Sequence, residues 1–97
     1  MNLPDFVVTA IEKGVQVTVD KLDGVFRIDM NTRMKSECVL YAVENGWEAH
    51  LRYNEVKPVS NWDDLVSAIS GCVYGKGFGS ATWFAILKAE GYSAKDL

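Results

Sequence analysis

The stretch that constrains the fold most strongly is WDDLVSAISGCVYGKGFGSATWFAILKAEG, residues 62–91. Apolar residues recur there every three or four positions on both sides of a glycine-rich segment, 75–79, which predicts two helices joined by a turn. The two apolar stripes are Trp62, Leu65, Val66, Ile69 and Val73, and then Trp83, Ile86 and Leu87 with Phe84 beside them. Because an amphipathic helix needs a surface to cover, the rest of the chain is expected to supply a small β-sheet.

The first thirty residues predict a short helix followed by a hairpin. Pro4 and Asp5 suit the first turn of a helix over residues 2–14, and Gly14 suits its end. Over residues 15–30, valines alternate with polar residues, and the Asp-Gly dipeptide at 23–24 is a signal for a two-residue turn. Folding about that turn sets three pairs opposite one another, the last of them an expected ion pair: Val17 with Met30, Val19 with Ile28, and Asp20 with Arg27.

Residues 31–45 allow two interpretations. Residues 38–43 form an apolar run, CVLYAV, and Asn45-Gly46 suits a hairpin turn, which would pair residues 38–44 with 47–53 as strands. A helix is favoured instead, because the strand interpretation needs a connection over 31–37 without glycine or proline, and Asn45-Gly46 also suits a helix end. The helical stripe would consist of Met34, Cys38, Tyr41 and Ala42.

A strand is predicted over 48–56 and is expected to end before Pro58. Ser60 or Asn61 is expected to cap the helix that follows, with Asp63 and Asp64 at the favourable end of its dipole. Ser80 is expected to cap the last helix and Gly91 to end it. The prediction is therefore one α+β domain over residues 1–97, with a small antiparallel sheet (hairpin 15–30 plus strand 48–56) covered by helices and a C-terminal helical hairpin over 62–91.

Composition excludes several functional classes. The 97 residues carry a net charge of −3 and show no basic stripe, which argues against general nucleic-acid binding. No apolar run approaches the roughly 20 residues of a membrane span, and no signal peptide is evident, so a cytoplasmic protein is expected. Cys38 and Cys72 are expected to be reduced, buried thiols, with a disulfide as the alternative. One histidine and two distant cysteines offer no metal site, and no cofactor is predicted.

Two groups of residues are weak candidates for a catalytic site or an anion-binding site. Glu48, His50 and Arg52 share one face of the predicted strand and are the groups that a metal-independent ribonuclease would use. Solvent exposure alone also selects charged residues on such a face, and this is the favoured explanation. The loop Gly75–Ser80 precedes a helix and contains Lys76, which would suit an anion, but the phosphate-loop and dinucleotide patterns are both absent.

Aromatic residues make up 11% of the chain, more than a small domain can bury completely. Trp47, Tyr74 and Phe78, with Lys76 in the same loop, are predicted to contact a protein partner. In its compactness, mild acidity and lack of a catalytic set, the chain resembles the small accessory proteins of phages and mobile elements, which usually bind a host protein and block it. The sequence thus predicts a protein-binding module, with an anion-binding or RNase-like protein as the alternative and self-association as a further possibility.

Overall fold

The computed structural model describes residues 3–22, 25–31, 36–51, 55–73 and 81–92 of the 97-residue chain. Its centre is a five-stranded antiparallel sheet in which the spatial order follows the sequence, β1-β2-β3-β4-β5. The strands are β1 (Gln16–Leu22), β2 (Val25–Asn31), β3 (Ser36–Val43), β4 (Gly46–Leu51) and β5 (Val56–Val59). The helices are α1 (Asp5–Glu12), α2 (Trp62–Val73) and α3 (Ala81–Ala89). The predicted α+β class is confirmed.

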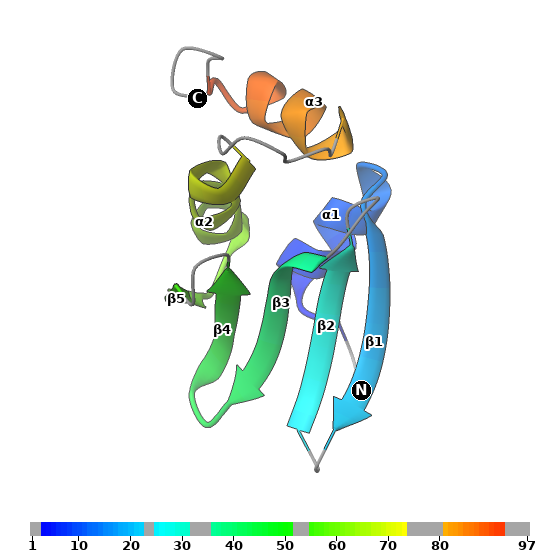
Figure 1. The fold of residues 1–97 in the computed structure, drawn as a ribbon, viewed down its shortest axis with the longest axis vertical. Coiled ribbons are helices and arrows are strands. Elements are labelled where there is room, and N and C mark those ends of the chain that lie inside the picture. The colour runs from blue at the N-terminus through cyan, green and yellow to red at the C-terminus, as the bar shows by residue number, and fades with distance from the viewer. Residues whose placement is uncertain (1–2, 23–24, 32–35, 52–54, 74–80, 93–97) are drawn as a thin grey trace.

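The helices gather towards one end of the sheet. Figure 1 shows α1 behind the strands, α2 above the end of β4, and α3 beyond both, while the β1–β2 and β3–β4 hairpins project in the opposite direction. No helix in the described ranges has the length and apolarity that a membrane crossing requires.

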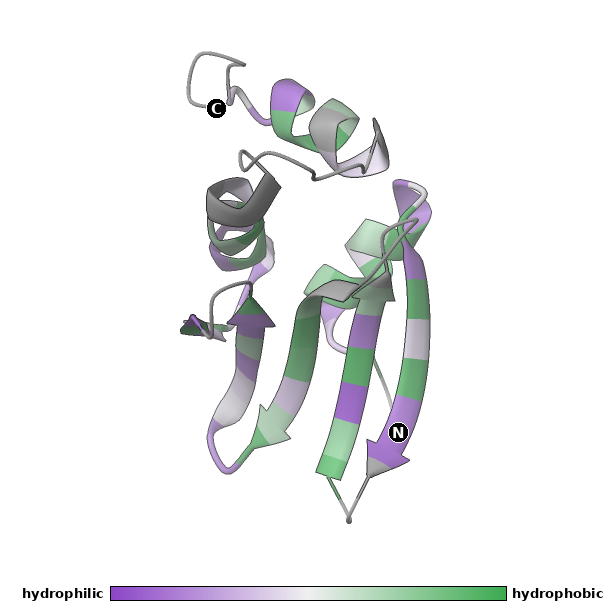
Figure 2. Ribbon diagram, in the orientation of Figure 1, coloured by the Kyte–Doolittle hydropathy of each residue, from purple (hydrophilic) through white to green (hydrophobic). Residues whose placement is uncertain are grey.

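The β1–β2 hairpin has the predicted register. Val17 lies opposite Met30, and Val19 lies opposite Ile28, as two apolar pairs on the face that bears the helices. The alternation that fixes this register is visible along both strands (Figure 2). The predicted ion pair is wrong in its partner, because Nη2 of Arg27 lies 3.5 Å from Oδ2 of Asp29 on its own strand. Asp20 instead accepts a hydrogen bond from the backbone N–H of Lys21 at 2.7 Å.

The helix favoured over 32–45 is wrong, and the strand alternative is right, because the structure has the strand β3 from Ser36 to Val43. It pairs with β2 on one side and with β4 on the other. In this interior position, the backbone N–H and C=O groups along both edges of the strand have hydrogen-bond partners. A seven-residue connection is not needed, since Asn31 and Ser36 already pair, with a register irregularity at Met30 and Asn31. Residues 44–45 form the turn to β4, and Gly46 follows it with φ of 141°, a conformation that favours glycine.

The strand predicted over 48–56 is confirmed for residues 48–51, which belong to β4, but its predicted end is wrong. The chain forms β4 as far as Leu51 and a separate short strand, β5, from residue 56 to 59, with residues 52–54 outside the described part. Pro58 does not end a strand but lies within β5, opposite Glu48. A proline is tolerated there because β5 is at the edge of the sheet, where one side of the strand has no ladder to donate to.

The helix ends follow the predicted capping residues where these are described. At the end of α1, Gly14 has φ of 100°, and the N–H groups of Gly14 and Val15 donate to the carbonyls of Ile11 and Ala10. This is a Schellman motif. The same pattern closes α3, where Gly91 has φ of 97° and the N–H groups of Gly91 and Tyr92 donate to Lys88 and Leu87. Asn61 caps α2 by accepting a hydrogen bond from the N–H of Asp64 at 2.8 Å.

The core lies between the helices and one face of the sheet. The predicted stripes of α2 and α3 are buried there at Leu65, Val66, Ile69, Trp83, Ile86 and Leu87. Facing them are the sheet residues Ile28, Met30, Cys38, Leu40, Ala49, Leu51 and Val59, together with Phe6, Val7 and Ala10 of α1. The predicted cap at Ser80, the residues after Tyr92 and the predicted stripe residue Met34 lie outside the described residues, and nothing is described of the side chains of Val73 and Phe84.

Candidate functional site

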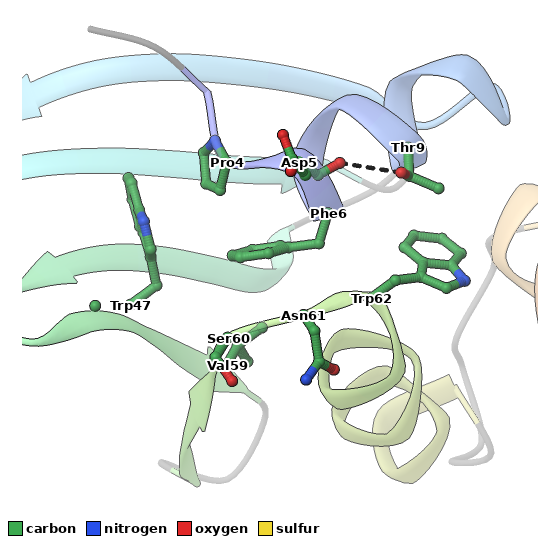
Figure 3. A pocket seen from close by; sticks show the side chains of 10 residues that line it. Pro4, Asp5, Phe6, Thr9, Trp47, Val59, Ser60, Asn61 and Trp62 are labelled. Carbon is green, nitrogen blue, oxygen red and sulfur yellow. Dashed lines mark hydrogen bonds between the residues drawn. The ribbon is translucent and has the colours of Figure 1, made fainter.

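A groove opens where the start of α1, the start of β4 and the junction of β5 with α2 come together. Its volume is about 390 Å³. Its lining combines aromatic and apolar side chains with a few polar ones: Pro4, Asp5, Phe6, Thr9, Gly46, Trp47, Val59, Ser60, Asn61 and Trp62. Figure 3 shows Trp47 and Trp62 at opposite ends with Phe6 between them, and we call this site the Trp47–Trp62 groove.

Each aromatic side chain of the groove is placed by a regular element. Trp47 is the second residue of β4 and lies opposite Val59 of β5, on the sheet face that bears the helices. Phe6 is buried on the inward face of α1, so its ring forms part of the floor. Because Trp47 is only half-buried, part of its indole remains accessible from the groove.

Trp62 is held in place from outside the groove. Its Nε1–H donates to Oε1 of Glu90 at 2.7 Å, and its ring stacks on that of Trp83 with centroids 6.4 Å apart. Nζ of Lys13 lies 5.8 Å from the centroid of the Trp62 ring. These contacts connect Trp62 to α3 and to the end of α1, so this end of the groove is a fixed wall.

The polar rim is organised by the cap of α2. The backbone N–H and the Oγ–H of Ser60 both donate to Oδ2 of Asp64, at 3.0 and 2.8 Å. These two hydrogen bonds, the backbone one first, lower the pKa of Asp64 below its ordinary value, and its carboxylate stays ionised. The same interactions hold Ser60 and Asn61 at the lip of the groove, opposite the exposed carboxylate of Asp5.

The described members of the weak catalytic candidate set, Glu48 and His50, do not line the groove. Nε2 of His50 is 3.7 Å from Oε1 of Glu48, and both side chains are 42% exposed. The ring of Tyr41 meets that of His50 edge to face at 4.5 Å. Glu48 and His50 alternate with Trp47 along β4, and Tyr41 contacts His50 from β3. All three therefore lie on the face of the sheet opposite Trp47, which we call the outer face. Arg52 lies outside the described residues.

The structure describes one of the four predicted partner-binding residues, Trp47. Trp47 lines the groove, whereas Tyr74, Lys76, Phe78 and the whole loop 75–80 lie outside the described residues. Cys38 is buried in the core, and nothing is described of the side chain of Cys72. Within the described ranges, no three His, Cys, Asp or Glu side chains are grouped so as to hold a metal ion.

Sequence reasoning missed most of the residues that line the groove. Trp62 was identified only through its helix pattern, and Pro4 and Asn61 only as residues at helix starts, while Phe6 was not singled out. The signal that was present is that Asn61 and Pro4 each stand at the start of a helix, with an aromatic residue one or two positions further on. It does not reveal that the two helix starts meet at Trp47.

Comparison of the chain with models of known protein families, with curated proteins and with solved structures finds no match in any of the three.

Proposed function

We propose that this protein is a small protein-binding module that acts by occupying a surface of its partner, and that the Trp47–Trp62 groove is the contact site. The observation that carries the proposal is the convergence of Trp47, Phe6 and Trp62 on one groove of about 390 Å³. Such a site offers a partner a large apolar contact at a small cost in side-chain entropy, because aromatic side chains have few rotatable bonds.

The arrangement of the groove supports this proposal in two further ways. Its walls are aromatic and its lip is polar, the anatomy of a protein interface with an apolar centre and a solvated rim. Within the described part of the chain, the indole N–H of Trp47 makes no hydrogen bond. A half-buried tryptophan with a donor still available is typical of an interface anchor.

The alternative of an anion-binding or RNase-like protein has less support. The described residues that could carry this alternative function are Glu48 and His50, whose solvent-exposed side chains approach to 3.7 Å between Oε1 and Nε2. General acid–base chemistry would require the pair to meet a substrate that is held in place. The groove, where a ligand has walls on several sides, is on the other face of the sheet.

A pull-down with matched variants tests the proposal. Tagged wild-type protein, Trp47→Ala and Val43→Ala are exposed to bacterial lysate with and without nuclease treatment, and captured proteins are identified by mass spectrometry. Val43 is an exposed apolar residue one strand away on the outer face, so its truncation controls for a loss of surface apolar area.

The expected result is a protein retained by the wild type and Val43→Ala and lost with Trp47→Ala. Equal capture of the same proteins by all three variants would remove the groove from the proposal. Retention that depends on nucleic acid would instead favour the alternative function.

A further inference from the structure

We propose that the Trp47–Trp62 groove receives an arginine side chain from a basic, extended segment of the partner protein. This inference rests on the proposed function and specifies the chemistry of what the groove binds. It is carried by the charges at the groove, by the available face of Trp47 and by the start of α1.

The charges at the groove have one sign. Among the described residues that line it, Asp5 is the only charged one. Asp63 and Asp64 occupy the first turn of α2, directly beside the lining residue Asn61, and the hydrogen bonds from Ser60 keep Asp64 ionised. A basic segment therefore gains attraction, whereas an acidic one would meet three carboxylates.

The positive charges near the groove, which oppose this attraction, are either partial charges at helix starts or a lysine that already contacts Trp62. The starts of α1 and α2 bring partial positive charge to the groove, but both carry acidic residues in the first turn that offset it. Lys13 is not part of the lining and lies 5.8 Å from the centroid of the Trp62 ring. That contact, together with the stacking on Trp83, already occupies Trp62.

Trp47 is the aromatic group that remains available to a ligand. Within the described residues it makes no ring stacking, cation–π contact or hydrogen bond, although it lines the groove. A cation stacks favourably on an indole, and the planar guanidinium of arginine does so while it also hydrogen-bonds to a carboxylate. Asp5 provides such a carboxylate on the same groove.

The chain already uses cation–aromatic contacts at its surface. Besides Lys13 over Trp62, Nζ of Lys21 lies 5.3 Å from the centroid of the Phe26 ring. Of the two tryptophans of the groove, Trp47 is the one for which the described part of the chain supplies no such cation. An arginine from a partner would complete that contact.

The start of α1 favours a peptide segment over a free cation. Pro4 precedes the helix and provides no side-chain cap, and the N–H of Val7 donates to the Pro4 carbonyl at 2.9 Å. Within the described residues, the first-turn N–H groups of Asp5 and Phe6 remain for an acceptor. A main-chain carbonyl of the partner is a neutral acceptor of the right kind. The volume of about 390 Å³ is also in the range of pockets that hold a ligand larger than one side chain.

Short peptides test the inference on the folded full-length chain. The probe is acetyl-Gly-Ser-Arg-Ser-Gly-amide, compared with the same peptide carrying citrulline, a neutral isostere, or glutamate in place of arginine. Binding is followed through the indole N–H resonances in ¹⁵N-labelled protein, with the Trp47 signal assigned by the variant Trp47→Phe. Asp5→Asn removes the proposed counter-ion, and Asp20→Asn, on the outer face, is its matched control.

The expected result is that the arginine peptide shifts the Trp47 indole resonance at millimolar concentration and binds about fivefold more tightly than the citrulline peptide. The difference should shrink in high salt and with Asp5→Asn, but not with Asp20→Asn. Equal binding of the arginine and citrulline peptides at Trp47 would overturn the arginine inference and leave the groove as a peptide site. No shift at Trp47 with any peptide would also overturn it, while the pull-down with Trp47→Ala decides the proposed function separately.

Discussion

At the scale of single residues, Trp62 does more for the fold than its place at the start of a helix suggests. Its indole donates a hydrogen bond to Glu90, stacks on the buried ring of Trp83 and lies beneath Lys13. One side chain thus connects α2 to α3 and to the end of α1. The sequence identified Trp62 only as a member of an apolar stripe, because periodicity reports a face of a helix and not its distant contacts.

We expect Trp62→Phe to lower the free energy of unfolding by about 1–2 kcal/mol, since it removes the hydrogen bond to Glu90 and part of the ring stack. Trp47→Phe is the matched control, because Trp47 is half-buried and makes no hydrogen bond within the described residues. Urea denaturation followed by circular dichroism measures both. A loss as large for Trp47→Phe as for Trp62→Phe would contradict this account of Trp62.

Asp64 should make stability depend on pH in the acid range. Its pKa in the folded chain is lowered by hydrogen bonds from the backbone and side chain of Ser60, whereas the unfolded value is near 3.8. The folded state therefore binds fewer protons, so the stabilisation is complete above the unfolded pKa and is lost as the pH falls through the folded pKa. Below about pH 4, the stability of the wild type is expected to fall more steeply than that of Asp64→Asn.

The measurement is the midpoint of urea unfolding from pH 6 to pH 2 for the wild type, Asp64→Asn and Asp63→Asn. Asp63 is exposed in the same helical turn and serves as the control for a general loss of charge at the dipole. If Asp64→Asn retained the full acid dependence of the wild type, the cap would not be its source.

At the scale of elements, the sequence correctly predicts the helices and strands whose residue pattern fits only one kind of secondary structure. The β1–β2 register follows from alternation and a turn signal that agree, and the ends of α1 and α3 follow from Gly14 and Gly91. β3 was mistaken for a helix because it is apolar on both faces: Cys38 and Leu40 point into the core, while Val39 and Tyr41 lie half-buried on the outer face. An apolar run of this kind has no period that separates strand from helix.

Gly46 follows the turn of the β3–β4 hairpin, and its substitution tests the backbone conformation at that position. Its φ is 141°, and an added Cβ would meet no atom within 4 Å, so the cost of a side chain comes only from the backbone conformation. Gly46→Ala should lower the free energy of unfolding by about 1–3 kcal/mol. D-alanine at the same position, introduced by chemical ligation, should be tolerated because its chirality favours positive φ.

Thermal unfolding of the two proteins separates conformation from packing. A similar loss with L- and D-alanine would indicate a steric cause and would contradict the positive φ. A loss with L-alanine alone would confirm the positive φ at this glycine, where the turn leads into β4.

At the scale of the whole molecule, the groove shows what sequence patterns leave out. Its lining comes from residues 4–9, 46–47 and 59–62, three segments that are far apart in the chain. Two of the errors in the predicted elements, at β3 and β5, lie at this meeting point, because β3 carries the hairpin that turns into Trp47 and β5 leads into Asn61. Without those strands, no pattern in the sequence places Phe6 beside Trp47.

The topology also predicts how the molecule folds. Each strand pairs with the next strand in the sequence, so the sheet contains contacts between segments that are close along the chain. The helix α1, by contrast, packs against α2, which lies far from it in the sequence. Local contacts close at a lower entropic cost than distant ones. We therefore expect the sheet to form in the folding transition state and α1 to dock after it.

Two substitutions at buried residues, with a similar expected loss of stability, test whether α1 docks after the sheet has formed. Ala10→Gly in α1 and Ile28→Val in β2 should each destabilise by about 1 kcal/mol. If α1 docks late, Ala10→Gly speeds unfolding about fivefold and hardly changes the folding rate, whereas Ile28→Val slows folding about two- to fourfold. Stopped-flow tryptophan fluorescence measures both rates. A slower folding rate for Ala10→Gly than for Ile28→Val would place α1 in the nucleus, and the groove wall that α1 supplies would then form before the sheet that carries Trp47.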